Sequence, residues 1–266
     1  MAKTPDRTQD LRAPQNGDVR PFKVASDLTL HDLSQALAAG ARDFRRAPQY
    51  GLFFASIFVA AGLAISAILT TREMLEWLIP ATAGFPILAP FTAVGLYEVS
   101  RRRAAGEALT WGAILGAVKG RGDDQILSMG VIIFVAFGFW VIVAHAIFSI
   151  AIVESRSGSE GLDFLLSQAG LIMLAAGTVV GAVIAFAFYA ITVVSLPMLV
   201  DHEVDFLTAI ITSLRAMKAN RGVLTAWAAF IAAALFVATI PAFLGLFVVL
   251  PMLGHATWHL YRRVVR

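Results

Sequence analysis

Four of the five histidines lie in or beside long apolar stretches, where they could bind a metal or haem. A haem held between helices needs two histidines at a similar depth. His145 falls near the outer side of its predicted span, whereas His255 and His259 fall near the inner end of theirs, so they cannot share one iron across a ~30 Å core. A metal site from His202, His259 and neighbouring acids is geometrically possible, but interfacial histidines usually only form hydrogen bonds. The sequence therefore predicts no metal and no cofactor.

Other catalytic chemistry also lacks its residues. The chain has no cysteine, which excludes disulfides, thiolate metal sites and cysteine nucleophiles. It contains no phosphate-binding loop, metalloprotease helix or nucleophile elbow. The predicted spans carry no acid or base well away from an interface, although ion-coupled transport usually needs one there. The sequence thus predicts a protein that is not an enzyme.

Composition indicates an all-α polytopic membrane protein. Of 266 residues, 58% are hydrophobic and 15% charged, and the mean hydropathy is +0.76. Soluble domains average about 45–50% apolar and about 25% charged residues. Because about 20 apolar residues cross the bilayer core, we expect six transmembrane helices, in a membrane domain over residues 27–266 that follows a disordered cytoplasmic tail at 1–26. The expected spans are about 50–71, 77–98, 127–152, 172–199, 222–240 and 241–260.

The distribution of basic residues indicates how the predicted spans are oriented in the membrane. The segments assigned to the inside hold 19 of the 21 lysines and arginines, and only Arg72 and Arg156 fall outside. Cytoplasmic loops are enriched in these residues. Both termini are therefore predicted to be cytoplasmic, in a multi-pass protein of the bacterial inner membrane. The net charge of +3 is explained by this asymmetry, so we expect no nucleic-acid partner.

An amphipathic segment at Asp32–Pro48 leads directly into the first span. Its helix is expected to start near Ser26 or Asp27, either of which could cap it. One face is apolar and the end near the membrane is basic, which suits a helix lying on anionic lipid or one packed on other parts of the same protein. A second copy is expected at Asp205–Arg221, offset by 173 residues, and a degenerate third copy at Glu107–Arg121. We therefore predict two to three cytoplasmic-surface helices and an internal repeat of surface helix plus hairpin.

Two sets of residues follow from this pattern. Basic residues in the three segments and in the basic loop before Glu107 are the predicted membrane-surface contacts, and glycines at small-residue spacing are the predicted helix-packing positions. The first set is Arg42, Arg45, Arg46, Arg101, Arg102, Arg103, Lys119, Arg215, Lys218 and Arg221; the second is Gly112, Gly116, Gly177 and Gly181.

Residues 19–54 also carry a resemblance. Their run Leu37, Gly40, Asp43, Phe44 and Pro48 resembles the start of a bacterial family of predicted integral membrane proteins, domain of unknown function family 2189. Residues 90–111 and 196–222 are similar to a wider group of six-span proteins built from repeated surface helices. The resemblance implies a fold and a location, and no activity.

The resulting functional hypothesis is a non-enzymatic inner-membrane protein that organises or helps to assemble membrane components, or interacts with lipid. Its expected partners are the lipid bilayer and possible other membrane proteins or further copies of itself. One alternative is an accessory subunit of a respiratory, cytochrome oxidase-like complex, which predicts an exposed packing face such as Gly177 and Gly181. The other is a transporter of an uncharged or lipidic solute, which predicts an open path between spans.

Overall fold

The computed structural model describes residues 22–71, 89–119, 124–155 and 162–266. These residues form helices, joined by turns, and one isolated antiparallel bridge between Val24 and Val265. In chain order the helices are α1 (Leu30–Arg46), α2 (Pro48–Thr71), α4 (Ala89–Ala105), α5 (Trp111–Gly116), the 3-10 turn η3 (Ala117–Lys119), α6 (Gln125–Ser155), α7 (Leu162–Leu166), α8 (Gln168–Thr192), α9 (Ser195–Asp201), α10 (Phe206–Ala219), α11 (Arg221–Thr239) and α12 (Leu246–Val264). The expected all-α class is confirmed for the described residues.

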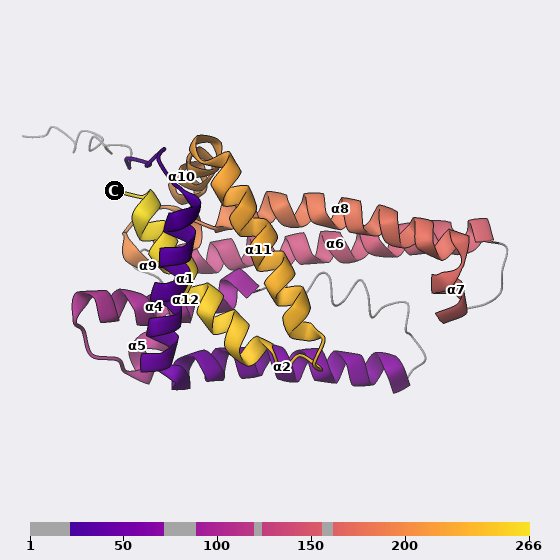
Figure 1. Ribbon diagram of the computed structural model, residues 1–266, viewed down its shortest axis with the longest axis horizontal. Coiled ribbons are helices and arrows are strands. Elements are labelled where there is room, and N and C mark those ends of the chain that lie inside the picture. Colours follow the sequence, from indigo (N-terminus) through magenta and orange to yellow (C-terminus); the bar gives the residue numbers. More distant parts are fainter. Residues whose placement is uncertain (1–21, 72–88, 120–123, 156–161) are drawn as a thin grey trace, which may run out of the picture.

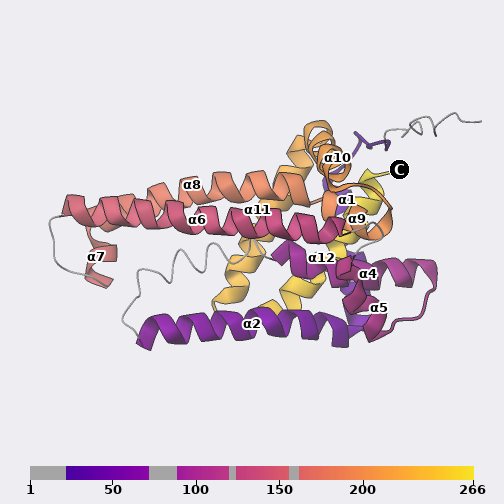
Figure 2. The same ribbon diagram turned by 180° about the vertical axis from the view of Figure 1, so that it is seen from behind.

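Four helical stretches of the described chain are long and apolar enough to cross a membrane: Pro48–Thr71, Gln125–Ala151, Gln168–Asp201 and Arg221–Thr239. The first three extend along the long axis of the molecule, and α6 lies beside α8 in both views (Figures 1 and 2). Helices α11 and α12 form a shorter, tilted hairpin whose second arm packs against α2. The protein is thus a membrane protein with several apolar helices.

The remaining two of the six predicted spans are not among these four. The predicted span 77–98 lies outside the described residues up to 88, and its remainder belongs to α4. The predicted span 241–260 begins in a turn, where Ala242 and Phe243 have positive φ values of 50° and 64°, and continues into α12. The second half of α12 carries His255, His259 and two arginines, which make it too polar to count with the other four. The number six therefore stays a prediction.

Helix α12 is the support against which the polar end of the bundle packs. Most of its residues are buried, and α1, α2, α4, α9 and α11 all contact it. The crossing with α1 is so close that a Cβ at Gly40 would come within 2.6 Å of the Ala256 backbone nitrogen. Of the two expectations for α1, packing on the rest of the protein is the one that the structure supports, because Leu33 and Ala36 are buried with Gly40.

The start of α1 differs from the prediction. Thr29, and neither Ser26 nor Asp27, caps the helix: its hydroxyl accepts from the Asp32 backbone N–H, and the Asp32 carboxylate accepts from the Thr29 backbone N–H at 2.7 Å. Asp205 is itself the N-cap of α10 and accepts from the Thr208 backbone N–H. The offset of 173 therefore aligns Asp32, the third residue of α1, with the N-cap of α10. The same offset does align the first residue of α2 with the first residue of α11. The repeat stays a prediction.

Residues 22–29 lie along the C-terminus, so the predicted disordered tail is wrong for residues 22–26. Ala25 donates its N–H to the Val264 carbonyl, and the side-chain amide of Asn220 bonds to the Ala25 carbonyl and the Leu28 N–H. Residues 1–21 lie outside the described part. Together with α1, α5, α10 and the C-terminus, residues 22–29 form what we call the polar end of the molecule (Figure 1).

Candidate functional site

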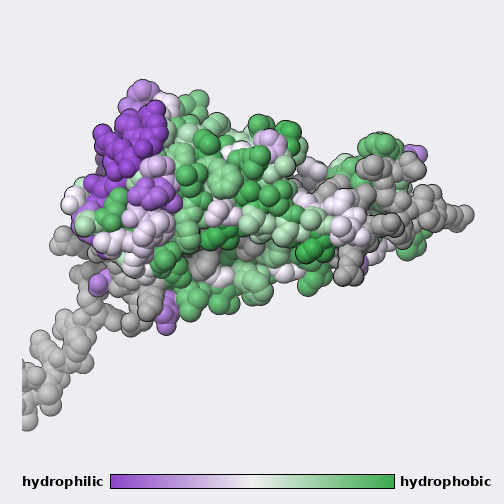
Figure 3. Space-filling view, turned by 90° about the horizontal axis from the view of Figure 1, so that it is seen from below, coloured by the Kyte–Doolittle hydropathy of each residue, from purple (hydrophilic) through white to green (hydrophobic). Residues whose placement is uncertain are grey.

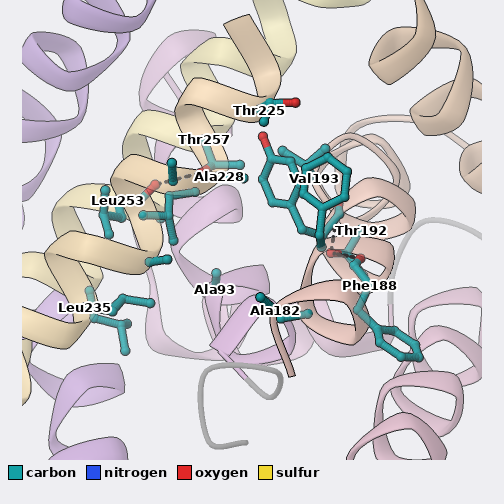
Figure 4. A pocket seen from close by; sticks show the side chains of 18 of the residues that line it. Ala93, Ala182, Phe188, Thr192, Val193, Thr225, Ala228, Leu235, Leu253 and Thr257 are labelled. Atoms are coloured by element: carbon teal, nitrogen blue, oxygen red, sulfur yellow. Dashed lines mark hydrogen bonds between the residues drawn. The ribbon is translucent and has the colours of Figure 1, made fainter. Parts of the chain in front are cut away.

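An apolar cavity of about 610 Å³ lies between α4, α8, α11 and α12. It is partly enclosed, and Figure 4 shows Leu253, Thr257 and Ala228 on one side facing Phe188 and Val193 on the other. Its volume falls within the ~300–1,000 Å³ range of small-molecule sites. The walls include two of the membrane-spanning candidates, α8 and α11, so the cavity lies among the apolar helices of the bundle.

Three of the five hydroxyl groups among the residues that line the cavity donate to the helix backbone. Tyr189 donates to the Leu224 carbonyl at 2.8 Å, Thr192 to the Phe188 carbonyl at 2.7 Å, and Thr257 to the Leu253 carbonyl at 2.8 Å. A hydroxyl that donates its only proton to its own or a neighbouring helix presents little polarity to a ligand. The rest of the lining is mostly carbon, with the hydroxyls of Tyr97 and Thr225 as its other polar side-chain groups. Such a lining suits an apolar chain, and the described lining residues include no carboxylate or amine.

One stripe of α11 forms its wall of the cavity. Thr225, Ala228, Ala232 and Leu235 all line the cavity and recur at alternating steps of three and four residues. Such residues share one face of a helix. Thr225 and Ala232 are exposed, whereas Leu235 is buried, so the stripe runs along the edge of the buried face. The cavity is therefore open toward the side of the bundle that faces its surroundings.

A second candidate site is a polar cluster at the crossing of α1, α4 and α12. The Asp43 carboxylate accepts hydrogen bonds from Ser100 Oγ at 2.8 Å, Arg103 Nε at 2.9 Å and His259 Nε2 at 2.8 Å. Burial opposes ionisation of Asp43, but the hydrogen bonds from His259, Ser100 and Arg103 outweigh it and hold its pKa well below the usual range. The cluster thus joins three helices through one carboxylate.

Ser100 also lies 2.8 Å from His255 Nδ1. Because Ser100 donates its single proton to Asp43, its oxygen accepts from Nδ1–H, which leaves Nε2 of His255 with a lone pair. Within the described residues that buried nitrogen has no hydrogen-bond partner. A catalytic triad would need histidine between serine and acid, whereas here serine is between them and is 1% exposed. This arrangement fixes helices and does not resemble a hydrolase site.

The histidines considered for a metal site are not brought together. His259 pairs with Asp43. His202 Nε2 lies 3.4 Å from Asp201 Oδ2, and the His202 ring packs against the ring of Phe22. No group of three or more possible ligands that could hold a metal ion occurs in the described part of the chain. One signal in the sequence could have found the cluster that does exist: Asp43 recurs with Leu33, Ala36 and Gly40 at steps of three and four, and these residues share the buried face of α1.

The predicted membrane-surface arginines divide into two groups. Arg101 is buried, with its guanidinium bonded to Glu98 and Glu107, which raise its pKa further; Arg102 also pairs with Glu98, and Arg103 with Asp43. The exposed group comprises Arg42, Arg45, Arg46, Arg215, Lys218 and Arg221. The side chain of Lys119 lies outside the described part. Contact with lipid stays a prediction, but the three arginines of α4 are held by acids of the same protein.

The glycines predicted to pack helices differ from one another in how closely another helix approaches them. A Cβ at Gly181 would come within 2.7 Å of the Trp140 ring, so α8 approaches α6 closely there. At Gly112, Gly116 and Gly177 a Cβ would meet nothing within 4 Å among the described residues. Their role in helix packing is therefore a prediction that this single chain does not test.

The fold and these sites define an integral membrane protein with several apolar helices. Residues 78–201 match the model of a family described as predicted integral membrane protein (DUF2189), the same family that the sequence resembles. The stretch at 19–54, which carried the resemblance, lies outside that match. Of the two stretches that are similar to the wider group, residues 90–111 lie inside the match and residues 196–222 overlap it only at 196–201. No curated protein and no solved structure matches the chain.

Proposed function

We propose that this protein is a non-enzymatic lipid-binding protein of the bacterial inner membrane, which organises lipid or helps to assemble membrane components. The observation that carries the proposal is the cavity of about 610 Å³ whose walls present mostly carbon to its interior. An acyl chain of a membrane lipid is the apolar ligand available in greatest amount around the helices that line it.

The orientation that we propose places the polar end in the cytoplasm. Figure 3 shows hydrophilic residues gathered at one end of the molecule, next to a long hydrophobic body. The positive-inside rule assigns the basic end to the cytoplasm. The cavity then lies within the hydrocarbon layer, where a lipid tail can enter it from the side.

Ala228→Phe tests the proposal, because it places a ring in the cavity. The matched control is Ala233→Phe, at an exposed position of the same helix that does not line the cavity. The ring occupies space that an acyl chain would need, so we expect the retention of lipid to fall several-fold with Ala228→Phe and to stay unchanged with Ala233→Phe.

The measurement is native mass spectrometry of the protein purified in mild detergent, with the collision energy raised until loosely held lipid is removed. Retention of one lipid by the wild type and by Ala233→Phe, and its loss from Ala228→Phe, would support the proposal. Equal retention by all three proteins, or no retained lipid in any, would overturn it. The carbon-lined walls also favour a lipidic solute over an uncharged polar one, should the protein transport its ligand.

A further inference from the structure

An arginine precedes the stripe of α11 that lines the cavity and lies on the same face of the helix. Arg221 precedes Thr225 by four residues, and the series continues through Ala228, Ala232 and Leu235 at steps of three, four and three. At about 100° per residue these five positions fall within about 80° of arc. Arg221 therefore stands above the cavity wall, at the polar end of the same helical face.

The length of this stripe suits one leaflet of a bilayer. From residue 221 to residue 235 the helix rises by about 21 Å, and half of the hydrocarbon core is about 15 Å thick. A chain that follows the stripe can thus lie at hydrocarbon depth while its headgroup is level with Arg221. Thr225, four residues after Arg221 on the same face, lines the cavity and is labelled in the close-up (Figure 4).

Among the described residues, no acid neutralises the charge of the basic side chains at the start of α11. Arg221 and Lys218, three residues earlier in the last turn of α10, are exposed and form no ion pair within the described residues. The arginines at the C-terminus differ, because Arg262 is paired with Asp201 and Arg263 with Asp27 and Asp32. A free pair of cations beside an apolar cavity is complementary to an anion that carries an apolar chain.

Selectivity must come from this headgroup region. A lipid tail that enters the cavity leaves one apolar medium for another, so the transfer itself contributes little free energy. Basic side chains near a membrane surface, in contrast, attract anionic lipids. The same cavity without cations would accept any tail, whereas the cations discriminate between headgroups.

We propose that the cavity binds one acyl chain of a phospholipid with a net negative headgroup, and that Arg221 contacts its phosphate with Lys218 as the second cation. This inference rests on the proposed function and adds the class of lipid. A basic residue at the membrane surface contributes about fivefold in affinity, the equivalent of ~1 kcal/mol. We therefore expect the wild type to prefer phosphatidylglycerol over phosphatidylcholine with the same acyl chains by roughly 25-fold.

The test is competition between these two lipids in native mass spectrometry of the full chain. Arg221→Gln should lower the preference to about fivefold, the double variant with Lys218→Gln should abolish it, and Arg221→Lys should preserve it. Arg42→Gln is the matched control, since Arg42 is an exposed arginine of α1, which does not line the cavity. Each protein's thermal unfolding midpoint confirms that it is folded before its lipids are compared.

Three results would overturn the inference. These are a preference near one in the wild type, an equal preference in the wild type and Arg221→Gln, and an equal loss with Arg42→Gln, which would indicate general surface charge. Glycerol phosphate, added alone in a further arm, should not displace the lipid; displacement would show an anion site that does not need the acyl chain. The proposed function fails separately, through lipid retention that Ala228→Phe leaves unchanged.

Discussion

Replacing Asp43 by asparagine should destabilise the protein by about 2–4 kcal/mol. The side chain keeps its size and one acceptor oxygen, but it loses its charge and brings an N–H₂ group toward donors. In the wild type, the Asp43 carboxylate accepts from three donors on two other helices: Ser100, Arg103 and His259. In the variant at least one of these donors loses its acceptor.

The magnitude follows from the burial of each partner. Removing one member of a buried ion pair costs about 3–5 kcal/mol. The side chains of Arg103 and His259 are 19% and 29% exposed, so water can replace part of what they lose. Ser100 is 1% exposed, and a buried hydroxyl without its acceptor costs about 1–3 kcal/mol. The sum lies below the cost of a fully buried pair and well above that of an exposed one.

Thermal unfolding in mild detergent, followed by tryptophan fluorescence, measures the effect. A chain of this size shifts its Tm by roughly 2–4 °C per kcal/mol, so we expect a decrease of about 4–16 °C. The control is Asp205→Asn, because Asp205 caps α10 and asparagine caps a helix as well as aspartate does. If the Tm values of Asp43→Asn and Asp205→Asn differed by less than about 1 °C, which corresponds to less than about 0.5 kcal/mol, the reasoning would be refuted.

The pH dependence gives an independent check. The pKa of Asp43 in the folded protein lies well below its usual range, because the hydrogen bonds from its partners outweigh burial. A lowered pKa means that the stabilisation is complete above the unfolded-state value of about 3.9 and is lost as the pH falls toward the folded value. The difference between wild type and Asp43→Asn should thus persist at pH 5 and shrink only below about pH 4.

Two further predictions concern the packing of α1 and of residues 22–29. Gly40→Ala places a Cβ 2.6 Å from the Ala256 nitrogen and should cost about 1–3 kcal/mol in the same unfolding assay, whereas Gly177→Ala, with open space around its Cβ, should be neutral or slightly stabilising. Asn220→Ala removes the two hydrogen bonds that the Asn220 side chain makes with Ala25 and Leu28, so we expect faster amide hydrogen exchange in residues 22–29 with a loss of about 1–3 kcal/mol; unchanged protection would contradict it.

The sequence predicted the apolar helices well because length and hydropathy alone decide them. The expected spans 50–71 and 222–240 agree closely with Pro48–Thr71 and Arg221–Thr239. The expected span 241–260 combines an apolar half with a polar one, and it stays a prediction. In α12 the first half is hydrophobic, but the second half is buried by α1 and α4, and its histidines bond to Asp43 and Ser100.

The cavity and the cluster could not be predicted, because both depend on which helices are neighbours. The stripe Thr225, Ala228, Ala232 and Leu235 is visible in the sequence, but alanine at such spacing is equally typical of close helix packing. Only the position of α8 leaves a space in front of it. Likewise, an acid at Asp43 indicates a partner without identifying it, since Ser100 and His259 are distant in the chain.

Two of the predicted surface helices, α1 and α10, differ in what covers their apolar faces. In α1 the apolar face is covered by α12, and the basic residues near its end are exposed. In α10, Leu207, Ile211 and Leu214 recur at steps of four and three and are 57%, 41% and 44% exposed, beside the exposed Lys218.

An apolar stripe that the protein leaves uncovered next to basic side chains suits the plane of a membrane interface. The prediction of surface contact is therefore better founded for α10 than for α1, and α10 is the helix that leads into Arg221 and the cavity wall.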